Sequence, residues 1–233
     1  MNDDTRQPER PTTLTPLAEA TLTELSQEPL AVNIVLGGGI ALKHYDDFRG
    51  TQDIDAWWRD ARDPETLTRI GETLGKVAQT YAFALEQRQF GATDSFELKG
   101  RSGKKEFSFQ IAVRDVALAE PLVSSWPPLW IETLQDNIGS KMNALTNRGA
   151  PRDFLDIYRV VQDRLLSVET CWQLWQAKNP GASPTQARGQ TLSHLRRLQS
   201  RRPLTAIADE TERQNADALR QWYQGVFLAM EGE

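Results

Sequence analysis

The spacing of apolar and polar residues divides the first half of the chain into short helices and strands. Apolar residues recur every three or four positions over residues 14–26, as on the buried face of an amphipathic helix. Short apolar or alternating runs bounded by turn residues predict strands. Asp63 and Pro64 are suited to the start of a longer helix, as N-cap and first helical residue. The expected elements are helices over residues 14–26, 40–46 and 64–81, and strands over residues 32–36, 52–58, 83–89, 95–99 and 106–113.

After Pro127 and Pro128 the spacing becomes helical throughout. Strands with intervening helices, followed by helices alone, predict an α+β fold with a small mixed sheet and a helical C-terminal half. We therefore expect a flexible leader over residues 1–13, a catalytic domain over residues 14–125 and a helical domain over residues 126–233. Proline and glycine breaks separate five expected helices, over residues 131–148, 152–166, 168–177, 185–199 and 209–230.

Length and composition exclude several classes of protein. The chain of 233 residues is 39% hydrophobic and 25% charged, which suits a soluble globular protein and argues against wholesale disorder. No apolar run approaches the roughly 20 residues of a membrane span, so no membrane partner is expected. Residues 1–4 lack the apolar stretch of a secretory signal, and Cys171 is the single cysteine. Both features are typical of a cytoplasmic protein.

The net charge of −5 disfavours a nucleic-acid partner, but the charge is distributed unevenly. Residues 178–208 contain six basic residues and no acidic one. Because a phosphate backbone responds to local charge more than to the total, this segment is a candidate RNA contact. A solvated helix face explains it equally well. The six residues are Lys178, Arg188, Arg196, Arg197, Arg201 and Arg202.

The clearest chemical signature comprises two segments. One is the turn between the strand over residues 32–36 and the helix over residues 40–46, and the other is the strand over residues 52–58. Residues 37–39 are all glycine, and Asp53 and Asp55 lie one residue apart on the strand over residues 52–58. Residues i and i+2 of a strand point to one face, so the two carboxylates can share divalent cations. The glycines let a phosphate approach the backbone. A turn for phosphates beside carboxylates for Mg²⁺ predicts a site where an NTP reacts.

Each half of this signature has a simpler explanation when it is taken alone. The glycines could form only a tight turn, and the aspartates could be solvated on a surface strand. Aspartate is disfavoured in strands, however, and two carboxylates on one face repel unless a cation or base compensates them. The combination therefore favours a functional site.

The order of these residues resembles the nucleotidyltransferase superfamily, in which a Gly-Gly or Gly-Ser turn follows a hydrophobic strand and Asp-x-Asp lies on the next. The form Gly-Gly-x-Ala-Leu with Arg-x-Thr-x-Asp-Ile-Asp is similar, more narrowly, to the AbiEii toxins of type IV toxin–antitoxin systems. A second match begins at Lys141 and is similar to that family's Lys-x-x-Ala-Leu, Arg and Arg-Asp-x-x-Asp elements. The two matches together span about residues 30–165.

The resemblance implies a nucleotide-binding role for five residues. Gly38 and Gly39 would lie against the phosphates, and Lys141 would hold a phosphate as a point charge. Arg49 could neutralise triphosphate charge or pair with an aspartate, since a guanidinium suits both partners. Thr51 could cap or brace the turn. Without the resemblance, Lys141 would be read as a surface lysine whose stem covers apolar residues.

The resemblance also implies a catalytic set of Asp53, Asp55, Lys141, Asp153 and Asp156, with Asp53 and Asp55 as the Mg²⁺ ligands. Asp153 near the start of its helix is explained by the helix dipole, which favours an N-terminal acid. Asp156 lies one turn further on, where that explanation is weaker. We therefore expect Asp156 to be the catalytic member, as a proton acceptor or as the group that orients Lys141, and Asp153 to be structural.

The sequence departs from the family pattern at two places. Ile40 stands where AbiEii-like proteins commonly have Thr or Ser, so a hydroxyl contact to phosphate is missing. Many nucleotidyltransferases carry a third carboxylate on a later strand. The corresponding strand here has Glu106, Ser108 and Gln110 on its polar face, with no Asp at the central position. Gln110 can coordinate through its carbonyl oxygen but cannot accept a proton. Either the later aspartates replace the missing group, or the enzyme is impaired.

Three functions are therefore open. The first is a metal-dependent nucleotidyltransferase that moves a nucleoside monophosphate from an NTP, such as ATP, to a hydroxyl of RNA. The resemblance implies that the acceptor is the 3′ end of tRNA and that the protein is a toxin with a cognate antitoxin partner. The second is the same chemistry on a protein or a small molecule. The third is a non-catalytic nucleotide-binding module.

Overall fold

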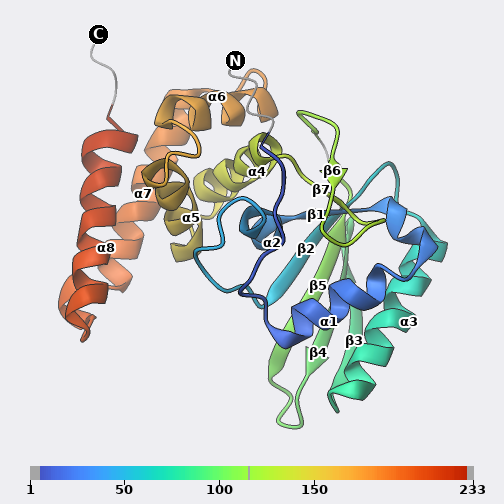
Figure 1. Ribbon diagram of the computed structural model, residues 1–233. Coiled ribbons are helices and arrows are strands. Elements are labelled where there is room, and N and C mark those ends of the chain that lie inside the picture. The colour runs from blue at the N-terminus through green and yellow to red at the C-terminus, as the bar shows by residue number, and fades with distance from the viewer. Residues whose placement is uncertain (1–5, 115, 230–233) are drawn as a thin grey trace. The chain divides into compact units, whose positions relative to one another are not determined.

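The computed structural model of the protein describes residues 6–114 and 116–229. The chain divides into two compact units, Met1–Asn137 and Ile138–Glu233. Figure 1 shows the sheet with α1, α2 and α3 in the first unit, and helices in the second. This arrangement confirms the α+β fold that the sequence predicts.

Seven strands of the described residues form one mixed sheet. The central strand β2 runs antiparallel to β1 and parallel to β5, so the segment between β2 and β5 must cross over. The strand order is β3-β4-β5-β2-β1-β7-β6. The strands are β1 (Ile34–Gly37), β2 (Asp53–Trp58), β3 (Ala84–Phe90), β4 (Thr93–Lys99), β5 (Lys105–Ala112), β6 (Leu122–Val123) and β7 (Trp130–Ile131).

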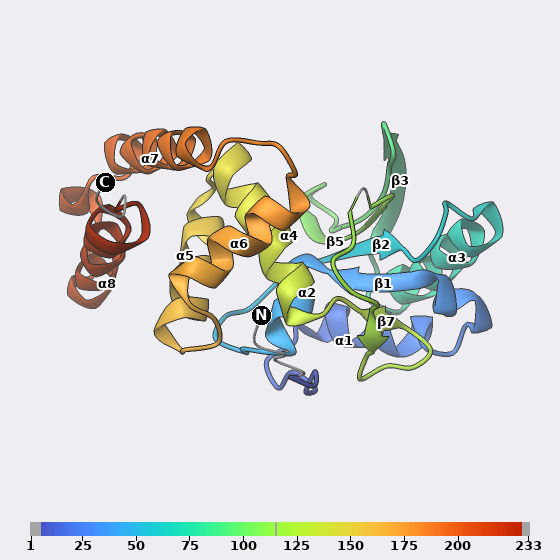
Figure 2. The ribbon, with the colours of Figure 1, turned by 90° about the horizontal axis from the view of Figure 1, so that it is seen from above.

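The two faces of the sheet differ because side chains alternate along each strand. On β2, Ile54 and Ala56 are buried in the core, whereas Asp53 and Asp55 point to the other face and are half-buried. The helices α1 (Pro16–Leu25) and α3 (Pro64–Thr80) contribute buried residues to this core, together with the neighbouring strands. Figure 2 shows α1 running along one side of β1 and β2. The sheet thus has an apolar face under helices and a polar face that carries both aspartates.

The boundary between the units falls at residue 137, whereas the sequence placed the change of character near residue 125. The difference arises because β6 and β7 return to the sheet, with β7 parallel to β1. Residue 131 therefore ends a strand and does not begin a helix, and α4 (Leu134–Asn147) starts three residues later. The apolar positions of a strand two residues long are too few to show its period in the sequence.

Residues 9–13, which the sequence assigns to a flexible leader, are hydrogen-bonded to the segment after α2 (Gly38–Lys43). The Asp47 carboxylate accepts hydrogen bonds from the backbone and hydroxyl groups of Thr12 and Thr13 at 2.6–3.0 Å. It also pairs with Lys43. Burial alone would raise the pKa of Asp47, but the hydrogen bonds from Lys43, Thr13 and Thr12 outweigh it and hold the pKa well below its usual range.

The second unit is built from helices whose positions agree closely with the sequence. Its core includes a cluster of Trp172, Trp222, Tyr223 and Phe227, whose ring centroids lie 4.9–5.2 Å apart. The last predicted helix is divided, because a π-helical turn over Tyr223–Phe227 follows α8; residue 230 lies outside the described residues. After α4, the helices are α5 (Pro151–Gln162), α6 (Val168–Lys178), α7 (Pro184–Arg201) and α8 (Glu210–Trp222), with a short 3-10 helix over Leu204–Ala206. A further 3-10 helix, over Pro29–Asn33, belongs to the first unit.

None of the helices in the described part of the chain combines the length and the apolar character needed to cross a membrane.

Candidate active site

The glycine turn lies directly against the second aspartate. Gly38 has a φ of +57°, in the left-handed region that side chains disfavour. A Cβ atom at Gly38 would overlap the carboxylate of Asp55, and one at Gly37 would overlap the indole nitrogen of Trp57. The register explains this proximity, since Gly37 on β1 is the partner of Asp55 on β2. These glycines are therefore required by close packing as well as by the turn.

Asp53 and Asp55 occupy one face of β2, as the sequence predicts. Asp53 accepts a hydrogen bond from the Ser108 hydroxyl at 2.7 Å, and Lys105 Nζ lies 3.1 Å from the same oxygen. The Asp55 carboxylate forms no hydrogen bond or ion pair with another residue in the two described ranges. A half-buried carboxylate without a partner, next to a second carboxylate, is electrostatically unfavourable unless a cation joins it.

These donors fit a magnesium ion. Mg²⁺ is commonly held by one or two carboxylates, with water and substrate phosphates completing its six ligands. No cluster of three or more His, Cys, Asp or Glu in the described residues has the arrangement of a metal site, so the protein itself would supply only the pair. Asp53 and Asp55 therefore suit a cation that arrives with a nucleotide better than a permanently bound structural metal.

Arg49 and Thr51 lie on the glycine side of the aspartate pair. A Cβ atom at Gly39 would be 3.1 Å from the Thr51 hydroxyl and 3.5 Å from a guanidinium nitrogen of Arg49. The Thr51 hydroxyl donates to the carbonyl of Asp53 at 3.0 Å, so Thr51 fixes the entry to β2. Arg49 brings a cation to the place where the sequence expects phosphates.

A buried polar network behind the glycine turn was missed by the sequence analysis. Glu132 and Asn137 are both fully buried. Glu132 accepts hydrogen bonds from the Trp57 indole and from the Asn137 amide, each at 2.9 Å. Asn137 also donates to the carbonyl of Gly38 at 3.0 Å. The network links the turn to β2. The one sequence feature that could have indicated it is Glu132, an acidic residue directly after an apolar run.

The register of β2 and β5 shows what occupies the place of a third carboxylate. Asp53 is paired with Ser108 and Asp55 with Gln110. The strand therefore presents a hydroxyl and an amide beside the aspartates, at the positions where the sequence has no aspartate. Ile40, the other departure, is fully buried, and its side chain packs in the apolar core.

Lys141 and Asp156 form a buried ion pair in the second unit. Lys141 Nζ lies 2.6 Å from Asp156 Oδ2, and the exposed fractions of the two side chains are 10% and 0%. A buried pair contributes little net stability because both charges lose their hydration. The pair joins α4 to α5 and fixes the direction of the Lys141 side chain.

Asp153 begins α5. Its carboxylate accepts a hydrogen bond from the backbone of Ala150 at 2.9 Å, where the helix starts. The guanidinium of Arg148 donates to both carboxylate oxygens, also at 2.9 Å. These contacts account for Asp153 through helix capping and a bidentate ion pair.

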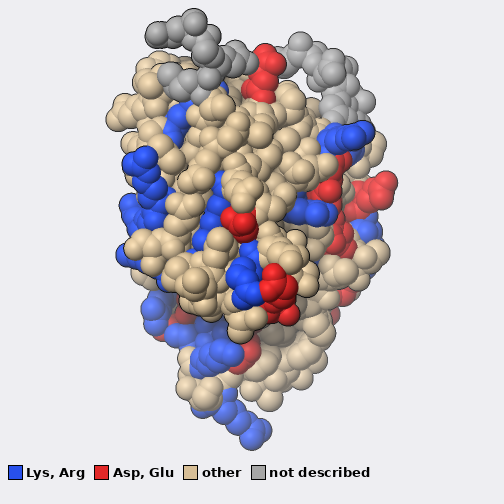
Figure 3. Space-filling model, turned by 90° about the vertical axis from the view of Figure 1, so that its left-hand side faces the viewer, with Lys and Arg blue, Asp and Glu red and all other residues tan. Residues whose placement is uncertain are grey.

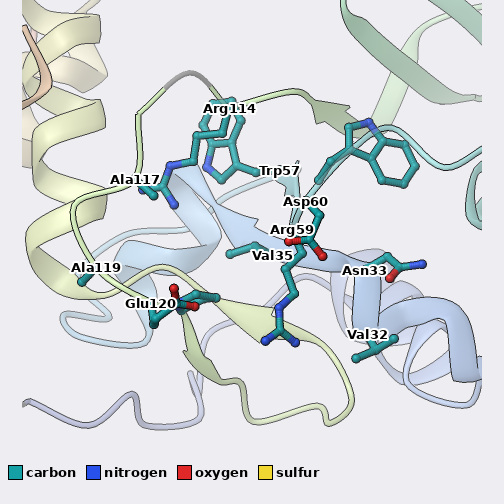
Figure 4. A pocket seen from close by; sticks show the side chains of 12 residues that line it. Val32, Asn33, Val35, Trp57, Arg59, Asp60, Arg114, Ala117, Ala119 and Glu120 are labelled. Carbon is teal, nitrogen blue, oxygen red and sulfur yellow. The ribbon is translucent and has the colours of Figure 1, made fainter.

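A pocket of about 460 Å³ opens beside the end of β2 in the first unit. Figure 4 shows Arg59, Asp60, Arg114 and Glu120 among the side chains that line it. Trp57, two residues after Asp55, forms part of the wall, but neither Asp53 nor Asp55 does. The pocket is therefore separate from the aspartate pair.

The basic segment of the second unit is smaller than its sequence suggests. Lys178 is buried, with its side chain packed where a Cβ at Gly139 would lie. Arg188 lies 4.8 Å from the centre of the Trp172 ring and donates to the carbonyl of Ala229. Figure 3 faces the side on which α7 and α8 lie and shows Lys and Arg side chains along it. Four of the six residues remain exposed on and after α7: Arg196, Arg197, Arg201 and Arg202.

The mixed sheet, the glycine turn and the aspartate pair on the neighbouring strand form the arrangement that the sequence leads us to expect of a nucleotidyltransferase. The model of the family described as nucleotidyl transferase AbiEii toxin, type IV toxin–antitoxin system, matches residues 20–225. The chain belongs to this family. No curated protein matches the chain.

Proposed function

We propose that the protein transfers a nucleoside monophosphate from an NTP to a hydroxyl of RNA, with the 3′ end of tRNA as the expected acceptor. In this proposal it is the toxin of a type IV pair, and a cognate antitoxin protein is its partner. The observation that carries the proposal is the unpaired Asp55 carboxylate, which lies beside Asp53 on one strand face and against Gly38.

The proposed reaction forms a bond from the acceptor oxygen to the α-phosphorus and breaks the bond from that phosphorus to pyrophosphate. Mg²⁺ bound to Asp53 and Asp55 would neutralise charge on the transferred and leaving phosphates. Arg49, beside Gly39, would bind triphosphate oxygens through its guanidinium.

The same proposal gives roles to Lys141 and Asp156. Lys141 would bind a substrate phosphate as a point charge, and Asp156 would orient its ammonium group through the 2.6 Å contact. Support comes from the family motif and from the contact between these two residues. Asp153, which caps α5, is left out of the chemistry.

Label transfer tests the proposal directly. The protein is incubated with each NTP labelled at the α-phosphate, Mg²⁺ and total RNA, and the label is followed into RNA. Asp53→Asn and Asp55→Asn should each lower transfer at least about 100-fold, because charge stabilisation at the phosphate is lost. Asp60→Asn, an exposed aspartate just after β2, is the control and should transfer at the wild-type rate. Equal transfer by Asp55→Asn would refute the role of the pair.

The acceptor class is decided by where the label travels. The net charge of −5 favours the second candidate, in which a protein or a small molecule is the acceptor. Label that moves with protein or with small solutes, and never with RNA, would establish it. Binding of NTP without release of pyrophosphate across all acceptors would instead establish a non-catalytic module.

A further inference from the structure

The aspartate pair has two different neighbours along the sheet. On the β1 side lie the glycine turn and Arg49, where the proposed function places the triphosphate. On the β5 side lie Ser108 and Lys105, both in contact with Asp53. An in-line displacement puts the incoming hydroxyl and the leaving pyrophosphate on opposite sides of the phosphorus. If the triphosphate lies on the β1 side, the acceptor must arrive from the β5 side.

The β5 side carries a basic hairpin. Residues 99–105 join β4 to β5 and contain Lys99, Arg101, Lys104 and Lys105 without an acidic residue. Because Asp53 is in register with Ser108, the hairpin extends three residues and a turn past the start of β2. Figure 1 shows it projecting beyond that strand. The cations therefore form a continuation of the aspartate site toward solvent.

Two of these cations are available to a ligand. Arg101 and Lys104 are exposed, and the side chain of neither forms a hydrogen bond or ion pair with another residue in the described ranges. Lys105, 44% exposed, links the hairpin to Asp53. Lys99 is occupied by Glu86 and Glu97. The hairpin thus offers two cations, Arg101 and Lys104, that form no ion pair with a described acid.

The neighbouring acids on the polar face do not oppose an anionic strand. Hydrogen bonds from Lys99 and Arg88 hold the pKa of Glu86 below its ordinary value, so Glu86 stays ionised but compensated. Lys99 also lies 3.4 Å from Glu97. Lys99 therefore offsets the acids of β3 and β4 next to the hairpin. Glu106, half-buried beside Gly100, is a further acid there, and the exposed cations without an ion pair are Arg101 and Lys104.

We propose that the hairpin over residues 99–105 binds the phosphodiester backbone of the RNA acceptor and guides it to the aspartate pair from the β5 side. Exposed, uncompensated cations beside a phosphoryl-transfer site suit a polyanion, since each phosphate contact releases bound counterions. This inference rests on the proposed function for the identity of the site, but it assigns a surface that the family motifs do not include.

Paired substitutions test the hairpin without touching the aspartates. The variant Arg101→Gln with Lys104→Gln is compared with Arg69→Gln with Lys76→Gln, which removes two exposed cations from α3. Fluorescein-labelled tRNA is titrated by anisotropy without NTP, and NTP–Mg²⁺ is titrated by calorimetry without RNA. The hairpin variant should bind tRNA about tenfold more weakly, and the slope of log K against log salt should fall by about 1 to 2. Its NTP affinity should be unchanged, and the α3 variant should behave as wild type.

The outcomes separate this inference from the proposed function. Weaker tRNA binding by the hairpin variant alone supports the inference, whether or not nucleotide transfer to RNA is observed. Unchanged tRNA binding, or a wild-type protein that binds no tRNA, overturns it. Loss of NTP affinity with unchanged tRNA binding would also overturn it, because the hairpin would then hold the triphosphate. Unchanged tRNA binding together with transfer to RNA that neither variant alters would leave the proposed function standing and remove the inference.

Discussion

Gly38 has both an unusual backbone conformation and a direct contact with a proposed metal ligand, Asp55. Alanine there would adopt an unfavourable φ of +57° and overlap Asp55, so we expect Gly38→Ala to displace this carboxylate. Nucleotide transfer should fall at least about 100-fold, and the free energy of unfolding should fall by about 1–2 kcal/mol. Radiolabel transfer and urea unfolding measure the two effects.

Gly75 provides the matched control for this glycine. It lies within α3, and a Cβ there would meet no atom within 4 Å. Gly75→Ala should raise the unfolding free energy by about 0.5–1 kcal/mol and leave transfer unchanged. Full activity in Gly38→Ala would show that Asp55 need not lie against the turn.

The pair of Lys141 and Asp156 allows stability and activity to be separated. Lys141→Met leaves a buried, unpaired Asp156, which should cost about 3–5 kcal/mol of unfolding free energy. Adding Asp156→Leu removes the unpaired charge and should restore most of that stability. Both variants should lack transfer, because the proposed phosphate-binding cation is absent. A stable double variant with wild-type transfer would show that the pair is only structural.

At the residue scale the sequence predicted the placement of the two aspartates better than it predicted the residues that support the glycine turn. Asp53 and Asp55 share a strand face because the period of a strand is two, and any strand over residues 52–58 would place them so. Glu132 and Asn137 were missed because their roles depend on contacts with residues far away in the chain, Trp57 and Gly38. Local spacing carries no record of such contacts.

The element scale offers a test of the distinction between Asp153 and Asp156. Asp153→Asn weakens the start of α5 and its pair with Arg148, so it should cost about 1–2 kcal/mol and keep transfer within about threefold. Asp163→Asn, in an exposed pair with Arg159 at the other end of α5, is the control and should cost less than about 0.5 kcal/mol. Thermal unfolding and initial transfer rates are measured in parallel. Loss of transfer in Asp153→Asn, at a temperature where it is folded, would reverse the assignment.

Helices and strands with a long run of periodic apolar positions were easier to predict from the sequence than short ones. The helix over residues 64–81 has nearly five turns, an N-cap at Asp63 and a proline at its first position, and it appears as α3 with its end one residue earlier. Strand β7 has two residues, and its existence depends on pairing with β1. The attachment of residues 9–13 likewise depends on Asp47, which lies about 35 positions along the chain.

At the scale of the whole molecule, the net charge does not describe the charge of individual surface segments. The chain carries −5 overall, yet residues 99–105 and the exposed arginines around α7 are locally basic. Burial also makes the surface charge differ from the charge counted in the sequence, since Lys178 is counted in the composition but is not exposed. Partners of this protein are therefore better inferred from exposed segments than from its sum of charges.

The stability of the molecule against acid should depend on one of its two histidines. His44 is buried at the end of α2, beside Trp126, with Asp47 and Lys43 as its charged neighbours. Burial lowers the pKa of His44 to about 4, and the remaining influences are smaller. The unfolded chain takes up a proton below its pKa of about 6.5, whereas the folded protein does not until about pH 4. Stability from this group is therefore present above pH 6.5 and is lost as the pH falls toward 4.

Urea unfolding at pH 7 and pH 5 measures this contribution. His44 should account for a loss of about 2 kcal/mol over this interval, since one pKa unit corresponds to about 1.4 kcal/mol. His44→Phe keeps an aromatic ring beside Trp126 and removes the titrating group, so its decrease should be smaller than that of wild type by this amount. His194→Gln replaces the other histidine, which hydrogen-bonds to the carbonyl of Thr146, and should keep the wild-type decrease. Equal decreases in the wild type and His44→Phe would mean that the carboxylates alone set the acid sensitivity, and that His44 takes up its proton as readily in the folded protein as in the unfolded chain.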